Sequence, residues 1–390
     1  MMDSRETTGI TGTAITGDIL LDVRHLSVDY QADAGDVHAV TDVSFALRRG
    51  EILGLAGESG SGKSTLAYAL ARLLRPPAVV TAGQVLYSPG VERQAARTSV
   101  HGGRRGRADG VDNAPLDILR LTPAQLRAFR WNDLAIVFQS AMNALNPVMT
   151  IGAQIVDVLA AHRPELSRGQ RYDRAAELVR LVGIAPDRLI SYPHELSGGM
   201  RQRATIAIAL ALSPDIIIMD EPTTALDVVV QHEILTEILR LRAELRFAVI
   251  FITHDLSLLL ELADTIAIMY AGRIVEYGAR RELAGQPRHP YSYGLLHSFP
   301  NLRGPRRTVL GIPGAPPDLR DVPPGCSFHP RCPFAFAPCS TTLPLLRPAT
   351  TQTSAEEHQQ VACHLYDPAF APAPPAEELL AAGYAALVRE

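Results

Sequence analysis

The residue types and spacing of a phosphate-binding loop occur at Gly57-Glu58-Ser59-Gly60-Ser61-Gly62-Lys63-Ser64-Thr65. Its glycines allow the backbone to curl so that successive N–H groups point into one concavity. A helical run is predicted at residues 66–74, and the positive end of its dipole would face the same concavity. We expect Lys63 to reach the β- and γ-phosphates of a nucleotide and the Ser64 hydroxyl to ligate Mg²⁺. The alternative interpretation is a Gly/Ser-rich turn that only caps a helix.

Two carboxylates, Asp220 and Glu221, come directly after the apolar run 216–219. A buried strand that ends beside the phosphate-binding loop would bring Asp220 to Mg²⁺, either directly or through a water molecule. Glu221 would then lie nearer the γ-phosphate, where it could orient or deprotonate the attacking water. Many strands end in acidic residues, so this pair alone would be weak evidence. It becomes informative because a phosphate-binding loop precedes it in the chain.

The strands and helices predicted around these residues indicate an α/β protein. Buried-type strands are expected at residues 51–56, 135–138, 216–219 and 248–253. A helix predicted at 231–245 separates the last two, and strands that alternate with helices favour a parallel sheet covered on both faces. Short alternating runs between residues 19 and 47 predict a small antiparallel sheet, and the helical stretch at about 140–213 indicates an inserted subdomain.

Composition limits the classes of protein that fit. The 390 residues allow two or three domains, and a hydrophobic content of 47% is enough to fill their cores. A net charge of −4 supplies no electrostatic argument for a nucleic-acid partner. Because no apolar run approaches bilayer-spanning length and residues 1–17 lack the apolar core of a signal peptide, we expect a cytosolic protein. Any membrane role would then depend on partner subunits.

Three segments outside this core have a distinct composition. Residues 1–17 predict a loose tail, and the Gly- and Arg-rich stretch at about 88–114 predicts a flexible surface insertion. The basic run within that insertion could touch a phosphate surface, although a solvated loop is the simpler interpretation. Beyond about residue 285, proline-rich segments replace regular periodicity, and we expect residues 286–390 to form an irregular C-terminal extension.

The four cysteines of the chain all lie in this extension, at Cys326, Cys332, Cys339 and Cys363. In a cytosolic protein such a group indicates a metal site before a disulfide. Four thiolates suit an iron–sulfur cluster or structural zinc, but the C-x₂₋₄-C pairs that zinc favours are absent. His329 and His364 keep a mixed Cys/His zinc site open, and thiols that only pack against their neighbours are the third alternative.

Residues 19–285 resemble the nucleotide-binding subunits of ABC transporters. Besides the phosphate-binding loop, the matching motifs are Leu196-Ser197-Gly198-Gly199-Met200-Arg201-Gln202, Gln139, Thr224-Ala225-Leu226-Asp227 and His254. The resemblance implies a P-loop NTPase of ABC type over residues 18–285, with a mixed sheet core, an antiparallel β subdomain and an inserted helical subdomain. It also implies that the chain binds ATP and Mg²⁺ and is an ATPase.

Site roles follow from the same resemblance. The expected catalytic residues are Lys63, Gln139, Glu221 and His254. Gln139 would contact Mg²⁺ or water, while His254 would bond the γ-phosphate and hold Glu221 and water in attack geometry. Tyr30 stands where the family has an aromatic residue that stacks on adenine. In this family the donors at Ser197, Gly198 and Gly199 serve the nucleotide held by the opposing subunit, next to the loop that ends at Asp227.

The extension has a resemblance of its own. The stretch from His289-Pro290-Tyr291 through Pro313-Gly314 to Cys326-Ser327-Phe328-His329-Pro330-Arg331-Cys332-Pro333 is similar to the C-terminal extension of peptide-importer ATP-binding subunits. In some relatives that extension carries a [4Fe–4S] cluster, which implies the four cysteines as its ligands. The resemblance predicts an ATPase that energises import of di- and oligopeptides from the cytoplasmic face of the cell membrane.

The same resemblance implies partners. They are a second ATPase subunit (a sister chain or a second copy), two transmembrane permease subunits and, indirectly, an extracytoplasmic substrate-binding protein. Two alternatives remain open from the sequence: an importer ATPase for nickel or another small solute, and a soluble ABC ATPase of DNA repair or translation. Soluble ABC ATPases of DNA repair or translation usually carry a coiled-coil insertion or two ATPase units in one chain, and this sequence has neither.

Overall fold

The computed structural model describes residues 18–33, 35–90, 115–139, 144–224, 226–298, 311–349, 359–371, 379–380 and 382–384. The tail predicted at 1–17 lies outside these residues, as does nearly all of the insertion predicted at 88–114.

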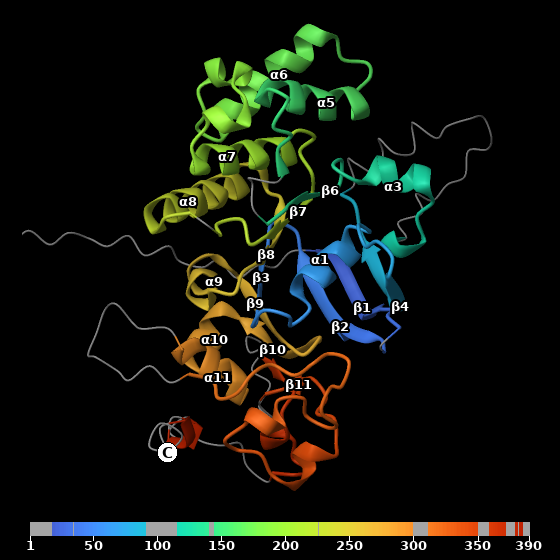
Figure 1. The fold of residues 1–390 in the computed structure, drawn as a ribbon, viewed down its shortest axis with the longest axis vertical. Helices are drawn as coiled ribbons and strands as arrows, with labels where there is room; N and C mark the ends of the chain where they lie inside the picture. Colours follow the sequence, from blue (N-terminus) through green and yellow to red (C-terminus); the bar gives the residue numbers. More distant parts are fainter. Residues whose placement is uncertain are drawn as a thin grey trace, which may run out of the picture.

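A mixed sheet forms the centre of the fold, with eight strands in the described part of the chain (Figure 1). Its parallel strands are, in order, β9 (Thr265–Tyr270), β3 (Ile52–Ala56), β8 (Ala248–Ile252), β7 (Ile216–Asp220) and β6 (Leu134–Val137). Every residue of β3, β6, β7 and β8 is buried, which explains why these strands are continuous apolar runs in the sequence. The strands predicted from those runs are confirmed to within one residue at each end.

The far edge of the central sheet is antiparallel. Strand β10 (Arg273–Ala279) pairs with β9, β12 (Gln360–Val361) pairs with β10, and β11 (Arg347–Pro348) pairs with β12. Because β11 and β12 belong to the C-terminal extension, backbone hydrogen bonds join that extension to the central sheet.

A second, antiparallel sheet lies beside the first, in the order β2-β1-β4-β5 among the residues described. Its strands are β1 (Ile19–Tyr30), β2 (Val37–Arg48), β4 (Ala78–Tyr87) and β5 (Leu116–Asp117). The predicted pairing of β1 with β2 is confirmed, whereas β4 and β5 were not predicted. Helix α1 (Lys63–Leu70) contributes Leu66 and Leu70 to a core shared by the two sheets. This helix begins three residues earlier and ends four residues earlier than predicted.

Helices cover the rest of the central sheet. The helical part at the top of Figure 1 contains α5 (Ile151–His162), α6 (Arg168–Leu181) and α7 (Gly198–Ala209), with 3₁₀ turns at Pro186–Ile190 and Pro193–Glu195. Helix α6 begins at a capping box, in which Ser167 and Gln170 each accept a hydrogen bond from the other's backbone N–H. The remaining helices near the sheets are α3 (Pro123–Phe129), α8 (Val228–Leu245) and α9 (Leu256–Leu262).

The C-terminal extension lies at the bottom of Figure 1, below β10. Helices α10 (Arg280–Gly285) and α11 (Pro290–His297) lead into it, and 3₁₀ turns at His329–Arg331, Ala337–Ser340 and His364–Tyr366 follow. The predicted α/β fold, with a mixed sheet, an antiparallel sheet and helices, is confirmed. Within the described ranges, no helix is both long enough and apolar enough to cross a bilayer.

Candidate active site

The predicted site residues lie where the parallel strands of the central sheet end. The phosphate-binding loop begins directly after β3, Asp220 is the last residue of β7, and His254 and Gln139 follow β8 and β6 by two residues. Because the carboxyl ends of parallel strands meet at one edge of a sheet, side chains from distant parts of the sequence converge there.

Two glycines of the phosphate-binding loop occupy positions that exclude a side chain. Gly57 has φ +147°, and a Cβ on it would lie 2.3 Å from the Met269 carbonyl oxygen. Gly62 has φ +100°, and a Cβ there would lie 2.1 Å from the Ala39 carbonyl oxygen. The loop therefore lies in close contact with the end of β9 in the central sheet and with the start of β2 in the antiparallel sheet. Its shape depends on both sheets.

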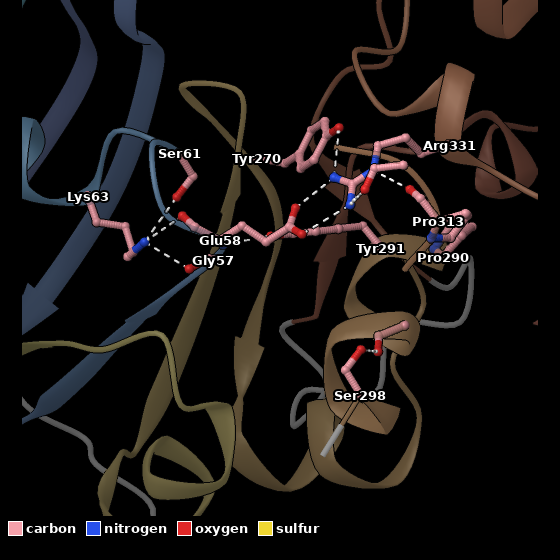
Figure 2. Close-up of polar contacts among 12 residues, drawn as sticks. Gly57, Glu58, Ser61, Lys63, Tyr270, Pro290, Tyr291, Ser298, Pro313 and Arg331 are labelled. Atoms are coloured by element: carbon pink, nitrogen blue, oxygen red, sulfur yellow. Dashed lines mark hydrogen bonds and ion pairs between the residues drawn. The ribbon is translucent and has the colours of Figure 1, made fainter. Parts of the chain in front are cut away.

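Lys63 is buried within the phosphate-binding loop. Its Nζ donates hydrogen bonds to the carbonyl oxygens of Gly57 and Glu58, both at 2.8 Å, and to Ser61 Oγ at 3.2 Å (Figure 2). Burial lowers the pKa of Lys63 to about 8, against the opposing effect of nearby carboxylates. The position of this ammonium group therefore depends on where the first two residues of the loop place their carbonyls.

Asp220 and Ser64 form a pair suited to a hard cation. Ser64 Oγ donates to Asp220 Oδ1 at 3.1 Å, while the buried Oδ2 has no hydrogen-bond partner among the described residues. Burial raises the pKa of Asp220, and the Ser64 hydrogen bond opposes this effect. A buried carboxylate oxygen with no partner, next to a hydroxyl, matches the oxygen ligands that Mg²⁺ prefers. These two residues therefore fit the predicted Mg²⁺.

Glu221 is held by three side chains. Its Oε2 accepts hydrogen bonds from Gln139 Nε2 at 2.9 Å and from Thr224 Oγ1 at 3.0 Å, and its Oε1 lies 3.3 Å from His254 Nδ1. The backbone of Glu221 is left-handed, with φ +46°, a conformation that costs free energy in a residue with a side chain. The structure thus brings Gln139, Glu221 and His254 together, and adds Thr224, which the sequence named only as the first residue of the 224–227 motif and not as a site residue.

Two tyrosines lie near the first turn of α1, one from β1 and one from α1 itself. The Tyr30 hydroxyl lies 3.2 Å from Thr65 Oγ1, so Tyr30 is beside the phosphate-binding loop, and its stacking on adenine stays a prediction. Tyr68 lies one turn after Ser64, and burial together with the charge of Asp220 raises the pKa of its hydroxyl. Tyr68 was missed, although its i+4 spacing from Ser64 could have indicated it.

Ser197, Gly198 and Gly199 lie apart from the phosphate-binding loop. Ser197 caps α7 by accepting a hydrogen bond from the Met200 N–H at 3.3 Å. A Cβ on Gly199 would lie 2.6 Å from Val230 Cγ1, so this end of α7 packs against the start of α8, which Asp227 caps. Figure 1 shows α7 in the upper helical part and α1 below it. No hydrogen bond among the described residues joins Ser197 or Gly199 to the loop.

Glu58 is bound by the C-terminal extension. Its carboxylate forms an ion pair with Arg331, at 2.7 Å between Oε2 and Nη1, and its N–H donates to the Tyr291 hydroxyl at 2.8 Å (Figure 2). The sequence placed Glu58 among the phosphate-binding residues, but both of these groups are engaged elsewhere. Arg331 was missed because it lies 273 residues from Glu58, and no local pattern indicates such a contact.

The four cysteines do not assemble the predicted ligand set. In the described part of the chain, no three His, Cys, Asp or Glu residues form a group that could hold a metal ion. The prediction of a [4Fe–4S] cluster at Cys326, Cys332, Cys339 and Cys363, with zinc as its alternative, therefore has no support in the structure.

Burial favours the protonated thiol form of Cys326 and Cys332. Burial, with a smaller contribution from charge on the other cysteines, raises the pKa of Cys326 to about 11 and that of Cys332 to about 12. Without a metal these two groups are thiols at neutral pH, and a metal that bound them would have to displace both protons. Nδ1 of His329 lies 3.0 Å from the Cys326 carbonyl oxygen, so that nitrogen is also engaged.

Two protein families match this chain. The family described as "ABC transporter" matches residues 40–224, and "Oligopeptide/dipeptide transporter, C-terminal region" matches residues 275–339. The first match contains the phosphate-binding loop and Asp220–Glu221. The second contains α11 and the Arg331 segment.

Curated relatives match over most of their length. The oligopeptide transport ATP-binding protein OppD of Escherichia coli is 41% identical over 84% of this chain and 90% of its own. The dipeptide transport ATP-binding protein DppD of Lactococcus lactis is 40% identical over 82% of this chain and 84% of its own. Among solved structures, a dimer of the ATP-binding cassette MJ0796 bound to ADP and Pi has a TM-score of 0.54 and 25% identity, covering 67% of this chain and 99% of that one. The chain therefore belongs to the ABC transporter family, among the ATP-binding proteins of oligopeptide and dipeptide transporters.

Proposed function

We propose that this protein is the ATP-hydrolysing subunit of a membrane ABC importer for di- and oligopeptides. The observation that carries the proposal is the cluster in which Gln139, Thr224 and His254 hold Glu221 beside the Ser64–Asp220 pair. The names of the relatives and the match of the C-terminal region favour peptides as cargo over nickel or another small solute.

The phosphates of ATP would bind to the phosphate-binding loop. Backbone N–H groups and the N-terminus of α1 supply partial positive charge, and Lys63 supplies a full charge. Ser64 and Asp220 would hold Mg²⁺, which neutralises negative charge on the phosphate oxygens when it is bound. Tyr30, which contacts Thr65, would stack on the adenine ring.

Hydrolysis requires an oriented water molecule, and Glu221 would be the group that orients or deprotonates it. Gln139 and Thr224 both donate to Oε2, which leaves Oε1 to face His254 and the water. A carboxylate fixed in this way loses little conformational freedom when the transition state forms. His254, which is more than half exposed, remains accessible to the γ-phosphate.

A second ATPase subunit would complete the site. Ser197 and Gly199 do not meet the phosphate-binding loop of their own chain, so their donors are available to the nucleotide of a partner, with Asp227 at the same interface. We infer that closure of the dimer assembles two such composite sites and that hydrolysis reopens them. The partner is a sister chain or a second copy.

The remaining parts of the proposal concern the whole transporter. Two permease subunits would hold the ATPase dimer at the cytoplasmic face of the membrane, and a substrate-binding protein would deliver peptide from outside. Residues 18–285 would form the nucleotide-binding domain, and residues 286–390 would form the extension. The [4Fe–4S] cluster stays a prediction from resemblance, and no step of the mechanism passes through it.

Co-purification from membranes tests this function. We expect the tagged chain to bring down its permease subunits and to show ATPase activity that rises with added peptides and does not rise with Ni²⁺. Recovery of an enzyme that is active only with DNA or ribosomes would overturn the proposal. The same complex, purified anaerobically, also tests the cluster: iron together with a broad visible band at about 400 nm would establish it, and absence of both would reject it.

A further inference from the structure

The phosphate-binding loop carries one charged side chain besides Lys63, and the C-terminal extension binds it. Arg331 Nη1 lies 2.7 Å from Glu58 Oε2, and Nη2 lies 3.0 Å from Oε1, so the pair is bidentate (Figure 2). The Arg331 side chain is only 6% exposed and that of Glu58 26%, so solvent screens this ion pair weakly.

Arg331 is itself held in one orientation. Its Nε donates to the Pro313 carbonyl oxygen at 2.7 Å, and its Nη1 donates to the Tyr270 hydroxyl at 3.3 Å. The guanidinium carbon lies 5.7 Å from the centre of the Tyr270 ring and 5.9 Å from that of Phe328. Contacts other than Glu58 therefore hold the guanidinium group in the orientation that its ion pair with Glu58 needs. A flexible ammonium group could not reproduce this arrangement.

The backbone of the loop is held from the same side. The Glu58 N–H donates to the hydroxyl of Tyr291, a fully buried residue of α11. The Tyr291 ring packs 4.7 Å from that of Tyr270 and 5.4 Å from that of Phe328, measured between ring centres. Both the side chain and the main chain of Glu58 are thus bound by residues of the extension.

This contact reaches the phosphate site through Lys63. The Glu58 carbonyl oxygen is one of the three acceptors that hold Lys63 Nζ, and the Gly57 carbonyl is another. A shift of Glu58 would therefore move the acceptors that place the lysine charge. It would also shift the peptide units whose N–H groups line the concavity.

We propose that Arg331 is a positioning residue for ATP binding: through Glu58 it holds the phosphate-binding loop in its phosphate-competent shape. The C-terminal extension then forms part of the support of the ATP site. This inference rests on the proposed ATPase function. The hydrogen bonds of the Arg331 side chain go to Glu58, Tyr270, Pro313 and Gly314 and not to Lys63, Ser64 or Glu221, so we expect it to act on affinity for ATP and not on the chemical step.

The first test compares variants of the full-length protein. For Arg331→Gln we expect KM for ATP to rise about tenfold or more, because a charge-assisted bidentate contact is lost, while kcat changes less than about twofold. Arg331→Lys keeps the charge but loses the two parallel N–H donors that bind the carboxylate. Its KM should therefore lie between those of the wild type and Arg331→Gln. The matched control is Arg347→Gln, since Arg347 also lies in the extension and pairs with Asp367 at 2.8 Å, but is exposed. Its KM should stay at the wild-type value.

Hydrogen–deuterium exchange supplies a readout that does not need hydrolysis. Without nucleotide, we expect Arg331→Gln to speed exchange in the peptide that covers residues 57–62, and Arg347→Gln to leave it unchanged. If Arg331→Gln fails to fold, Arg331→Lys carries the same comparison.

A double-mutant cycle separates positioning from general stability. Because Arg331 acts through Glu58, we expect the effects of Arg331→Gln and Glu58→Gln on KM to be strongly non-additive. Additive effects, or wild-type exchange and KM in Arg331→Gln, would overturn the inference. A wild-type protein that binds no ATP would instead reject the proposed function, so the two failures are distinguishable.

Discussion

Replacing Glu221 by glutamine should separate ATP binding from hydrolysis. The structure indicates that the amide can be accommodated. Its carbonyl oxygen can take the place of Oε2 and accept from Gln139 and Thr224, while its NH₂ group faces His254 Nδ1, which accepts in the neutral imidazole protonated on Nε2. Because every partner keeps a hydrogen bond, the free energy of unfolding should change by no more than about 1 kcal/mol.

The loss of activity should be far larger than the loss of stability. An amide does not accept a proton from water, and a general base contributes about 10²–10⁴-fold to a rate, or about 3–5 kcal/mol of transition-state free energy. We therefore expect kcat to fall by that factor, with ATP affinity within about threefold of wild type. Equilibrium binding of a fluorescent ATP analogue and single-turnover hydrolysis measure the two quantities separately.

A matched control defines the outcome. Glu177→Gln makes the same chemical change at an exposed residue of α6 that pairs with Arg174, and it should alter neither quantity. If Glu221→Gln kept kcat within about fivefold of wild type, Glu221 would not be the group that activates water. If the Glu221→Gln variant lost ATP binding as well, the hydrogen bonds of Glu221 would serve mainly to hold the residues of the site in place.

Two further predictions concern the buried charges. Burial raises the pKa of Asp220, so the free energy of unfolding should fall as pH rises through that pKa; Asp220→Asn should remove this pH dependence from Tm measured without nucleotide and abolish the Mg²⁺-dependent increase in Tm with ATP. An undiminished Mg²⁺-dependent increase would contradict the assignment of Asp220 as a metal ligand. Burial lowers the pKa of Lys63 to about 8, so the native protein loses this charge above that pH, and KM for ATP should rise between pH 7.5 and 9.5. A flat KM profile would show that the lysine charge does not control affinity in this range.

Local patterns predicted well the strands at whose carboxyl ends the candidate site residues lie. The strands β3, β6, β7 and β8 are fully buried, so each is an apolar run that can be read without knowing its neighbours. Gln139, Asp220 and His254 follow these runs at their carboxyl ends, and parallel pairing then brings them together. Strand β4 was missed because half of its residues are exposed, which leaves no continuous apolar run.

The C-terminal extension was predicted less well. Its composition indicated irregular structure, but strands β11 and β12 are two residues each, too short to produce a periodic pattern. The four cysteines favoured a metal site on count and spacing alone. The arrangement and burial of their side chains, which decide whether thiolates can meet a metal, depend on packing that spacing does not encode.

From local sequence alone, a phosphate-binding loop, a carboxylate for Mg²⁺ and a glutamate that activates water could be predicted, because each motif is contiguous and its chemistry follows from adjacent residues. What supports that loop is visible only in the folded chain. The bidentate pair of Arg331 and Glu58 joins residues 273 positions apart, and such a contact arises from the way β10, α11 and the extension pack beneath the loop. Contacts of this kind depend on the position of the backbone in space, which no local pattern of residues specifies.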